Sequence, residues 1–241
     1  MIKKAIKKLI SFLPQKLIEV YLVSKFKYDI LSHSQHGEDV ILRNLFKHKK
    51  NGFFVDIGAY HPYIFSNTYA LYRSGWKGIN IDPAPGKMSL FKKERPLDMN
   101  LEMGVAEKAQ ILDFYTFDKS ALNTFSYNRM LDLEKHGYKV QQKIGVQTMP
   151  LGAILDKNLV PNQPIDFMNI DAEGLDLEVL KSNNWLKYRP SVIAVEDGDF
   201  DIENKDASSI YRFLKEKEYT LVAFMQKTLI FSKAELLCMH Q

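Results

Sequence analysis

Cysteine is almost missing from this chain of 241 residues, because Cys238 near the C-terminus is the only one. One cysteine cannot form an intramolecular disulfide, and no histidine or cysteine spacing suggests a zinc site. Proteins that are stable without disulfides are typical of reducing compartments. We therefore expect a cytoplasmic location.

Long apolar runs are missing too. No segment approaches the roughly 18 apolar residues that a membrane-spanning helix needs. The chain is nevertheless 46% apolar and 12% aromatic, so it can bury one sizeable core, and its length favours a single domain.

Excess positive charge is absent outside the N-terminal segment. Residues 1–27 carry seven lysines against Glu19, a formal charge of +6, whereas the whole chain has +4. Because the excess positive charge is confined to one short segment, a nucleic-acid-binding surface across the fold is not expected.

Residues 1–31 are expected to form a basic amphipathic helical segment. Over residues 1–13, apolar residues recur at helical spacing and lysines occupy the other face: Ile2, Ala5, Ile6, Leu9, Ile10 and Leu13 against Lys3, Lys4, Lys7 and Lys8. Such a helix can lie on the anionic inner face of the cytoplasmic membrane, where each lysine contributes on the order of 1 kcal/mol. It can equally pack on the domain or on a second subunit, and the sequence leaves both alternatives open.

The three-glycine pyrophosphate fingerprint is absent from the strongest candidate ligand site. An apolar run at 53–57 contains Asp56 and leads into Gly58 and Ala59, and a second run at 78–82 ends at Asp82. Two such runs joined by one helix predict parallel strands buried on both faces. The bulky turn at 60–62 disfavours a dinucleotide and favours a nucleoside without phosphates, such as S-adenosylmethionine, with Asp82 at the ribose. A strand pair without a ligand is the alternative.

The rest of the chain predicts a doubly wound sheet. Strands are expected at 99–106, 111–117, 164–171 and 190–196, with an antiparallel pair at 219–224 and 227–232. Residues 118–147 lack a clean strand period and mix polar with aromatic side chains. This predicts an insertion that forms a lid over the site or a wall of the acceptor-binding site, here called the acceptor wall. We therefore divide the chain into residues 1–31 and a domain at 32–241 that carries this insertion.

Five sequence blocks occur in an order that we recognise: Ser34–Asp39, Phe54–Ala59, Ser66–Thr68, Asn80–Pro83 and Ile170–Gly174. Through these five blocks the chain resembles the FkbM-type S-adenosylmethionine-dependent methyltransferases over about residues 32–231. The resemblance implies a class I methyltransferase fold of the α/β class. Its Rossmann-like, doubly wound, mostly parallel sheet has seven strands and an antiparallel C-terminal hairpin, here preceded by N-terminal helices.

The resemblance also implies methyl transfer to oxygen, with S-adenosylhomocysteine as product. Bacterial members that look like this chain are mostly associated with surface glycans such as O-antigen, so the expected acceptor is a sugar hydroxyl of such a glycan or its precursor. Two alternatives stay open: a small hydroxylated secondary metabolite as acceptor, and a non-catalytic interaction subunit. Amine methylation is disfavoured, because residues 171–174 replace the Asn/Asp-Pro-Pro-aromatic clamp of enzymes with that activity.

A hydroxyl acceptor must lose its proton, so carboxylates and histidines at the strand ends are the candidate catalytic residues. We select Asp171, Glu173 and His61, each of which has a structural alternative as a helix cap, a first-turn acid or a packed loop residue. Carboxylates of Asp171 and Glu196 could instead hold Mg2+, which would lower the pKa of a bound hydroxyl, although we assign no dedicated metal ligand.

The residues expected to bind the donor come from five segments of the chain. They are Asp56, Gly58 and Ala59 at the methionine end, Asp82 at the ribose, Ser66 and Asn67 at the carboxylate, Gln35 and Glu38 from the preceding loop, and Asn100 at the adenine.

Overall fold

The computed structural model describes residues 30–234. The basic segment expected at 1–31 lies outside this range except for its last two residues, and so does Cys238. Within residues 30–234 no helix is long and apolar enough to cross a membrane.

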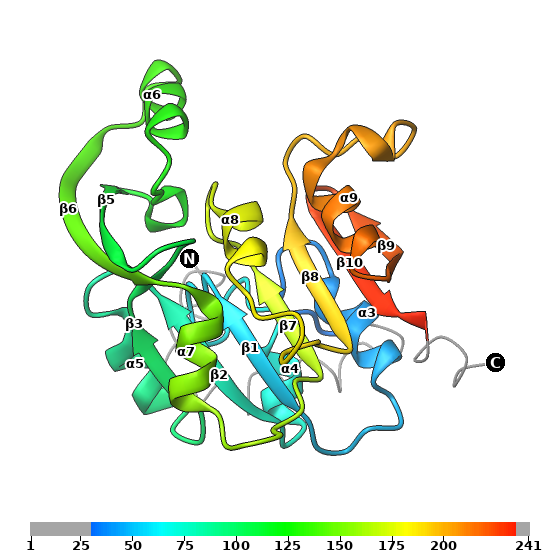
Figure 1. The fold of residues 1–241 in the computed structure, drawn as a ribbon. Helices are drawn as coiled ribbons and strands as arrows, with labels where there is room; N and C mark the ends of the chain where they lie inside the picture. Colours follow the sequence, from blue (N-terminus) through cyan, green and yellow to red (C-terminus); the bar gives the residue numbers. More distant parts are fainter. Residues whose placement is uncertain (1–29, 235–241) are drawn as a thin grey trace, which may run out of the picture.

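A seven-stranded sheet forms the centre of the protein, in the order β3-β2-β1-β7-β8-β10-β9 (Figure 1). Its strands are β1 Phe53–Ile57, β2 Lys77–Asp82, β3 Met99–Glu102, β7 Phe167–Ile170, β8 Val192–Glu196, β9 Tyr219–Met225 and β10 Thr228–Lys233. The first five strands of this order are parallel, and β10 runs antiparallel to both β8 and β9. The expected fold, with its antiparallel C-terminal hairpin, is confirmed.

Helices cover both faces of this sheet, which explains the unbroken apolar runs of its central strands. In β1, Val55 and Ile57 belong to a core that includes side chains of α7 Leu151–Asn158, α8 Asp176–Lys181 and α9 Ser209–Glu216. Phe54 faces the opposite side, where it joins Leu42 of α3 Glu38–Leu45 and Leu71 of α4 Tyr69–Arg73. Successive residues of a strand therefore bury opposite faces.

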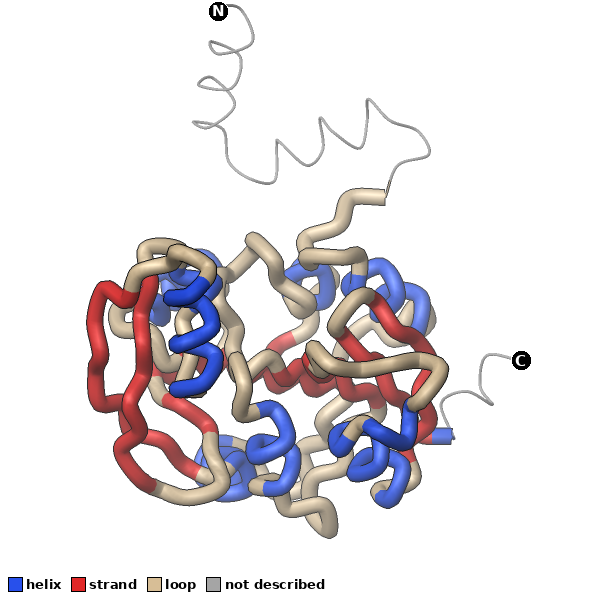
Figure 2. The backbone as a smooth tube through the Cα atoms, turned by 90° about the horizontal axis from the view of Figure 1, so that it is seen from above, coloured by secondary structure: helices blue, strands red, loops and turns tan. Residues whose placement is uncertain are grey.

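A second, three-stranded sheet stands beside the first, and it corrects two expectations. It is formed by β4 Gly104–Val105, β5 Gln110–Phe117 and β6 Val140–Met149, in the order β4-β6-β5. The strand expected at 99–106 is therefore divided between two sheets, and the segment at 111–117 does not extend the main sheet. Seen from above, the long strands of this ribbon lie to one side of the main sheet (Figure 2).

Residues 118–147, which show no clean strand period in the sequence, nevertheless include part of a strand. They contain the start of β6, together with a short helix, η1 Ser120–Leu122, and the helix α6 Tyr127–Lys135. Only Val146 and Thr148 of β6 are buried, and half of its ten residues are exposed, because α6 covers only part of the ribbon through a cluster of Tyr115, Phe117 and Met130. A strand with so little burial carries few apolar residues, so its period is weak in the sequence. We call residues 104–149 the ribbon module.

Candidate active site

The carboxyl ends of β1, β2 and β7 lie at the same edge of the sheet (Figure 1). A pocket lies there, where a doubly wound sheet places its ligands. Of the residues selected from the sequence, nine line it: Gln35, Asp56, Gly58, Ala59, Ser66, Asn67, Asp82, Asp171 and Glu173. Glu38, Asn100 and His61 are not among its lining residues. Residues that sequence reasoning did not select also line it, chiefly Tyr60, Lys87, Val105, Phe114, Asn123 and Asn169.

The floor of the pocket depends on the close approach of two strand ends. Gly58 has a φ of +76°, and a Cβ at this position would lie 1.8 Å from the carbonyl oxygen of Asp171. The amides of Gly58 and Ala59 both donate to the carbonyl of Ile81, at 2.9 and 3.1 Å. Only glycine fits this position, so the first turn after β1 is bound tightly to the ends of β2 and β7.

Asp82 lies at the end of β2 and fixes the turns around it. Its Oδ2 accepts from the amide of Tyr60 at 2.8 Å, and its Oδ1 accepts from the amide of Ala84 at 2.9 Å. Burial raises the pKa of Asp82, although Lys87 and these two amides oppose the shift. Since a carboxylate has about four acceptor positions, each oxygen can accept a further hydrogen bond from a ligand hydroxyl.

Asp56 organises the pocket wall through its partners. Thr68 Oγ1 donates to its Oδ2 at 2.6 Å, and Asn169 Nδ2 donates to its Oδ1 at 2.9 Å. Asn169 in turn accepts from Asn67 Nδ2 at 2.9 Å. Burial raises the pKa of Asp56, and the bond from Thr68 and the charge of Arg95 oppose this. The side chains of β1 and β7 thus hold Asn67 at the pocket.

Behind Asp56 lies a buried ion pair that sequence reasoning missed. The Arg95 guanidinium is fully buried, bonds Asp98 at 2.8 Å and donates to Thr68 Oγ1 at 3.0 Å. Asp98 also accepts from Asn80 Nδ2 at 3.0 Å. Asn100 belongs to this group, because its Oδ1 accepts from Asn80 Nδ2 at 2.8 Å. The structure therefore places Asn100 in a buried network on the main sheet.

The polar loop before α3 is folded around Asp39. This buried carboxylate accepts from Ser32 Oγ at 2.6 Å, from the His33 amide at 2.8 Å and from Ser34 Oγ at 2.9 Å. The Ser66 amide donates to the carbonyl of His33 at 3.0 Å. These bonds bring Gln35 and Ser66 to the same wall of the pocket.

Glu38, in contrast, does not line the pocket. It accepts from the His36 amide at 2.9 Å and from Thr228 Oγ1 at 3.1 Å, so it joins the loop to β10.

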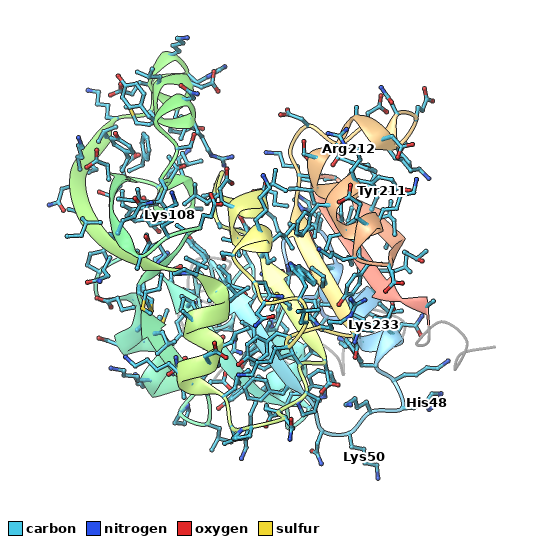
Figure 3. All side chains as sticks on the ribbon, in the orientation of Figure 1. His48, Lys50, Lys108, Tyr211, Arg212 and Lys233 are labelled. Atoms are coloured by element: carbon cyan, nitrogen blue, oxygen red, sulfur yellow. The ribbon has the colours of Figure 1, made fainter. Side chains whose placement is uncertain are left out.

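The histidine selected as a base is a turn residue in this structure. His61 Nδ1 accepts from the amides of Tyr63 and Ile64, at 3.3 and 3.2 Å. Burial and then the charge of Lys87 lower the pKa of His61. His48 lies in the loop that leads into β1, at the amino ends of the strands (Figure 3), and is therefore remote from the pocket.

Three carboxylates gather at the ends of β7 and β8. Asp171, Glu173 and Glu196 each place an oxygen within 4.8 Å of the other two. Asp171 Oδ1 is buried and has no hydrogen-bond partner within the described residues. Burial, followed by the charges of Glu196 and Glu173, raises the pKa of Asp171 well above its usual range.

The pKa of Glu173 is shifted towards neutral pH. Burial raises the pKa of Glu173 to about 8, Arg129 opposes the shift and Glu196 adds to it. A group with this pKa can release a proton and take one up near neutral pH, which is what a general acid–base residue requires.

Asp176 supports the turn that carries Glu173. It accepts from the amides of Ala172 and Gly174 at 2.8 and 3.2 Å, and burial raises its pKa to about 7.

The ribbon module supplies the remaining wall. Ser120, Ala121, Asn123 and Phe125 line the pocket from this side. Thr124 Oγ1 donates to the carbonyl of Glu173 at 2.6 Å, and Arg129 forms an ion pair with the Glu173 carboxylate at 2.7 Å. The module and the main sheet therefore meet at Glu173.

The chain matches the family model of the methyltransferase FkbM domain over residues 56–221. No curated protein sequence matches it significantly. Because the match covers more than half of the chain, this protein belongs to the FkbM methyltransferase family, and the resemblance noted in the sequence is confirmed. The fold and the family together define a methyltransferase.

Proposed function

We propose that the protein transfers a methyl group from S-adenosylmethionine to a sugar hydroxyl of a bacterial surface glycan or its precursor. The observation that carries this proposal is the pairing of two features in one pocket. Asp82 lies where a ribose acid belongs, and Asp171 and Glu173 present carboxyl groups to the same space.

The lining residues fit the donor. Asp82 keeps acceptor positions for two ribose hydroxyls, and Val105, Phe114 and Met103 offer apolar surface for a flat base. Gln35, Asn67 and the turn at Gly58 offer polar groups for the methionine end. When bound, S-adenosylmethionine supplies an electrophilic methyl group on a sulfonium. The task left to the protein is to align the acceptor oxygen and to take its proton.

Glu173 is our candidate for that proton transfer. Its pKa of about 8 allows part of the population to be ionised near neutral pH. Burial and the charges of Glu196 and Glu173 raise the pKa of Asp171 well above its usual range, which favours a protonated Asp171 that can donate a hydrogen bond within the group. His61 is the weaker candidate, since backbone amides already occupy its Nδ1.

The module side of the pocket supports a sugar acceptor. Ser120 and Asn123 offer a hydroxyl and an amide, and Phe125 offers an aromatic face. A sugar ring presents hydroxyls at its edge and C–H groups on its face, so it can use all three. A small hydroxylated metabolite is the second candidate acceptor, because the same wall would suit a hydroxylated ring.

Mg2+ is an alternative way to activate the hydroxyl. Asp171 and Glu196, with Glu173 beside them, offer the oxygen ligands that this cation prefers. A cation bound there would lower the pKa of a coordinated hydroxyl.

Peripheral contact of residues 1–13 with an anionic membrane also remains a proposal. Sedimentation with anionic liposomes, before and after deletion of these residues, tests it.

The experiment that tests the function is a methyl-transfer assay with radiolabelled S-adenosylmethionine. The acceptors are a panel of bacterial polysaccharides, nucleotide sugars and small hydroxylated metabolites, each with and without EDTA. We expect label on a sugar oxygen. Label on the small metabolites alone would favour the second candidate acceptor. No label on any acceptor would favour a non-catalytic subunit. Activity that EDTA abolishes and Mg2+ restores would favour activation of the hydroxyl by the cation.

A further inference from the structure

Arg129 belongs to the ribbon module, yet its charged group lies against the main sheet. It is in the first turn of α6, where its amide donates to Ser126 Oγ at 3.2 Å. Its guanidinium reaches Glu173 Oε2 at 2.7 Å, and the two side chains are 33% and 25% exposed. A side chain with a fixed backbone and a partly buried partner makes a better defined ion pair than a flexible surface lysine does.

The turn that carries Glu173 needs support. Glu173 has a φ of +52° and Gly174 a φ of +101°. A non-glycine residue in this left-handed region is strained. The module offers two contacts that hold the turn: Thr124 donates to the Glu173 carbonyl, and Ser126 packs so closely that a Cβ on Gly174 would lie 3.0 Å from the Ser126 Cβ.

Electrostatic repulsion acts against this placement of Glu173. Asp171, Asp176 and Glu196 surround it with carboxyl groups. Two lysines also lie near the group: Lys227 Nζ is 3.8 Å from Glu196, and Lys87 lines the same pocket and is influenced by the charge of Glu173. Arg129 is therefore the cation that directly contacts Glu173 among the ion pairs of the described residues.

We infer that Arg129 is a positioning residue for methyl transfer. It holds the Glu173 carboxylate beside Asp171, and with Thr124 it joins the acceptor wall at 120–125 to the acid–base group as one unit. This inference rests on the proposed function. Arg129 acts through Glu173, and no direct contact of Arg129 with either substrate is required.

A double-mutant cycle tests this inference. Arg129→Gln is expected to lower kcat on the order of 10- to 100-fold, as small misplacements of reacting groups do, and to leave the affinity for S-adenosylmethionine unchanged. Arg129→Lys should restore part of the rate. In a Glu173→Gln background, Arg129→Gln should have no further effect. Arg189→Gln is the matched control, because it removes an exposed ion pair with Glu218, which lies 3.3 Å away.

An equal loss of rate in both backgrounds would overturn the inference. Hydrogen–deuterium exchange gives a second readout that does not depend on activity. Peptides covering residues 172–175 should exchange faster in Arg129→Gln than in the wild type or in Arg189→Gln, and unchanged exchange would also overturn the inference. If the wild type transfers no methyl group to any acceptor, the proposed function fails, whereas the exchange data still decide whether Arg129 holds the turn.

Discussion

Replacing Glu173 with glutamine is expected to lower turnover by about 100- to 10,000-fold, the range that general base catalysis contributes. Glutamine keeps the size of the side chain and an oxygen that can accept from Arg129, but it cannot take the proton of a hydroxyl. The affinity for S-adenosylmethionine should not change, since Asp82 and the turn at Gly58 hold the donor in our account. Steady-state kinetics and calorimetry of the same preparation measure both quantities.

The pH dependence of the wild type should follow the same residue. Because the pKa of Glu173 is raised to about 8, the carboxylate form is in the minority at pH 7 and prevails above pH 8. The rate should therefore rise with pH through this range, and the rise should be lost in Glu173→Gln. Glu203→Gln is the matched control, because Glu203 is an exposed acid in the loop after β8. A Glu173→Gln variant with the wild-type rate would remove this residue from the mechanism.

Gly58→Ala is expected to destabilise the fold by more than about 4 kcal/mol, which is exceptional for one substitution. The new Cβ would lie 1.8 Å from the Asp171 carbonyl oxygen, and the two residues directly follow the paired strands β1 and β7, which cannot move apart cheaply. The positive φ adds about 1–2 kcal/mol. Chemical unfolding monitored by circular dichroism measures the loss of unfolding free energy. Failure to obtain folded protein is the extreme form of the same result.

Gly86→Ala provides the matched control for that substitution. Gly86 has a φ of +79°, close to that of Gly58, but nothing lies within 4 Å of its Cβ position. The free energy of unfolding of this variant should fall only by the strain of an alanine in the left-handed backbone conformation. If the two variants were equally stable, the close approach of β1 and β7 would not be essential to the pocket floor.

The main sheet was predictable because burial on both faces leaves a strong signal. Phe54, Val55 and Ile57 must all be apolar, since adjacent residues of β1 enter different cores. The ribbon module was not predictable in detail for the opposite reason. Only two of the ten residues of its long strand β6 are buried, so polar residues are tolerated at many positions and the alternation is weak in the sequence.

The site was predictable where function depends on local sequence. Asp82 and Gly58 stand at strand ends, and a strand end can be located from the residues beside it. The contacts of Arg129 and Thr124 with Glu173 were not predictable, because they join residues 44 to 49 positions apart through the packing of the module. Asn100 was selected from the third expected strand as a neighbour of the adenine, whereas its side chain turns into the network of Asn80 and Asp98.

Isothermal titration with S-adenosylmethionine and S-adenosylhomocysteine, on the wild type and on Asp82→Ala, determines whether the pocket at the strand ends binds this donor through Asp82. Glu102→Ala is the control, because Glu102 ends the next strand and accepts from the Gly86 amide at 2.8 Å without lining the pocket. We predict binding by the wild type and by Glu102→Ala, and binding at least tenfold weaker in Asp82→Ala, since a hydrogen bond to a charged group contributes about 1.5–3 kcal/mol. Absence of binding by the wild type, or equal binding by Asp82→Ala, would contradict the account.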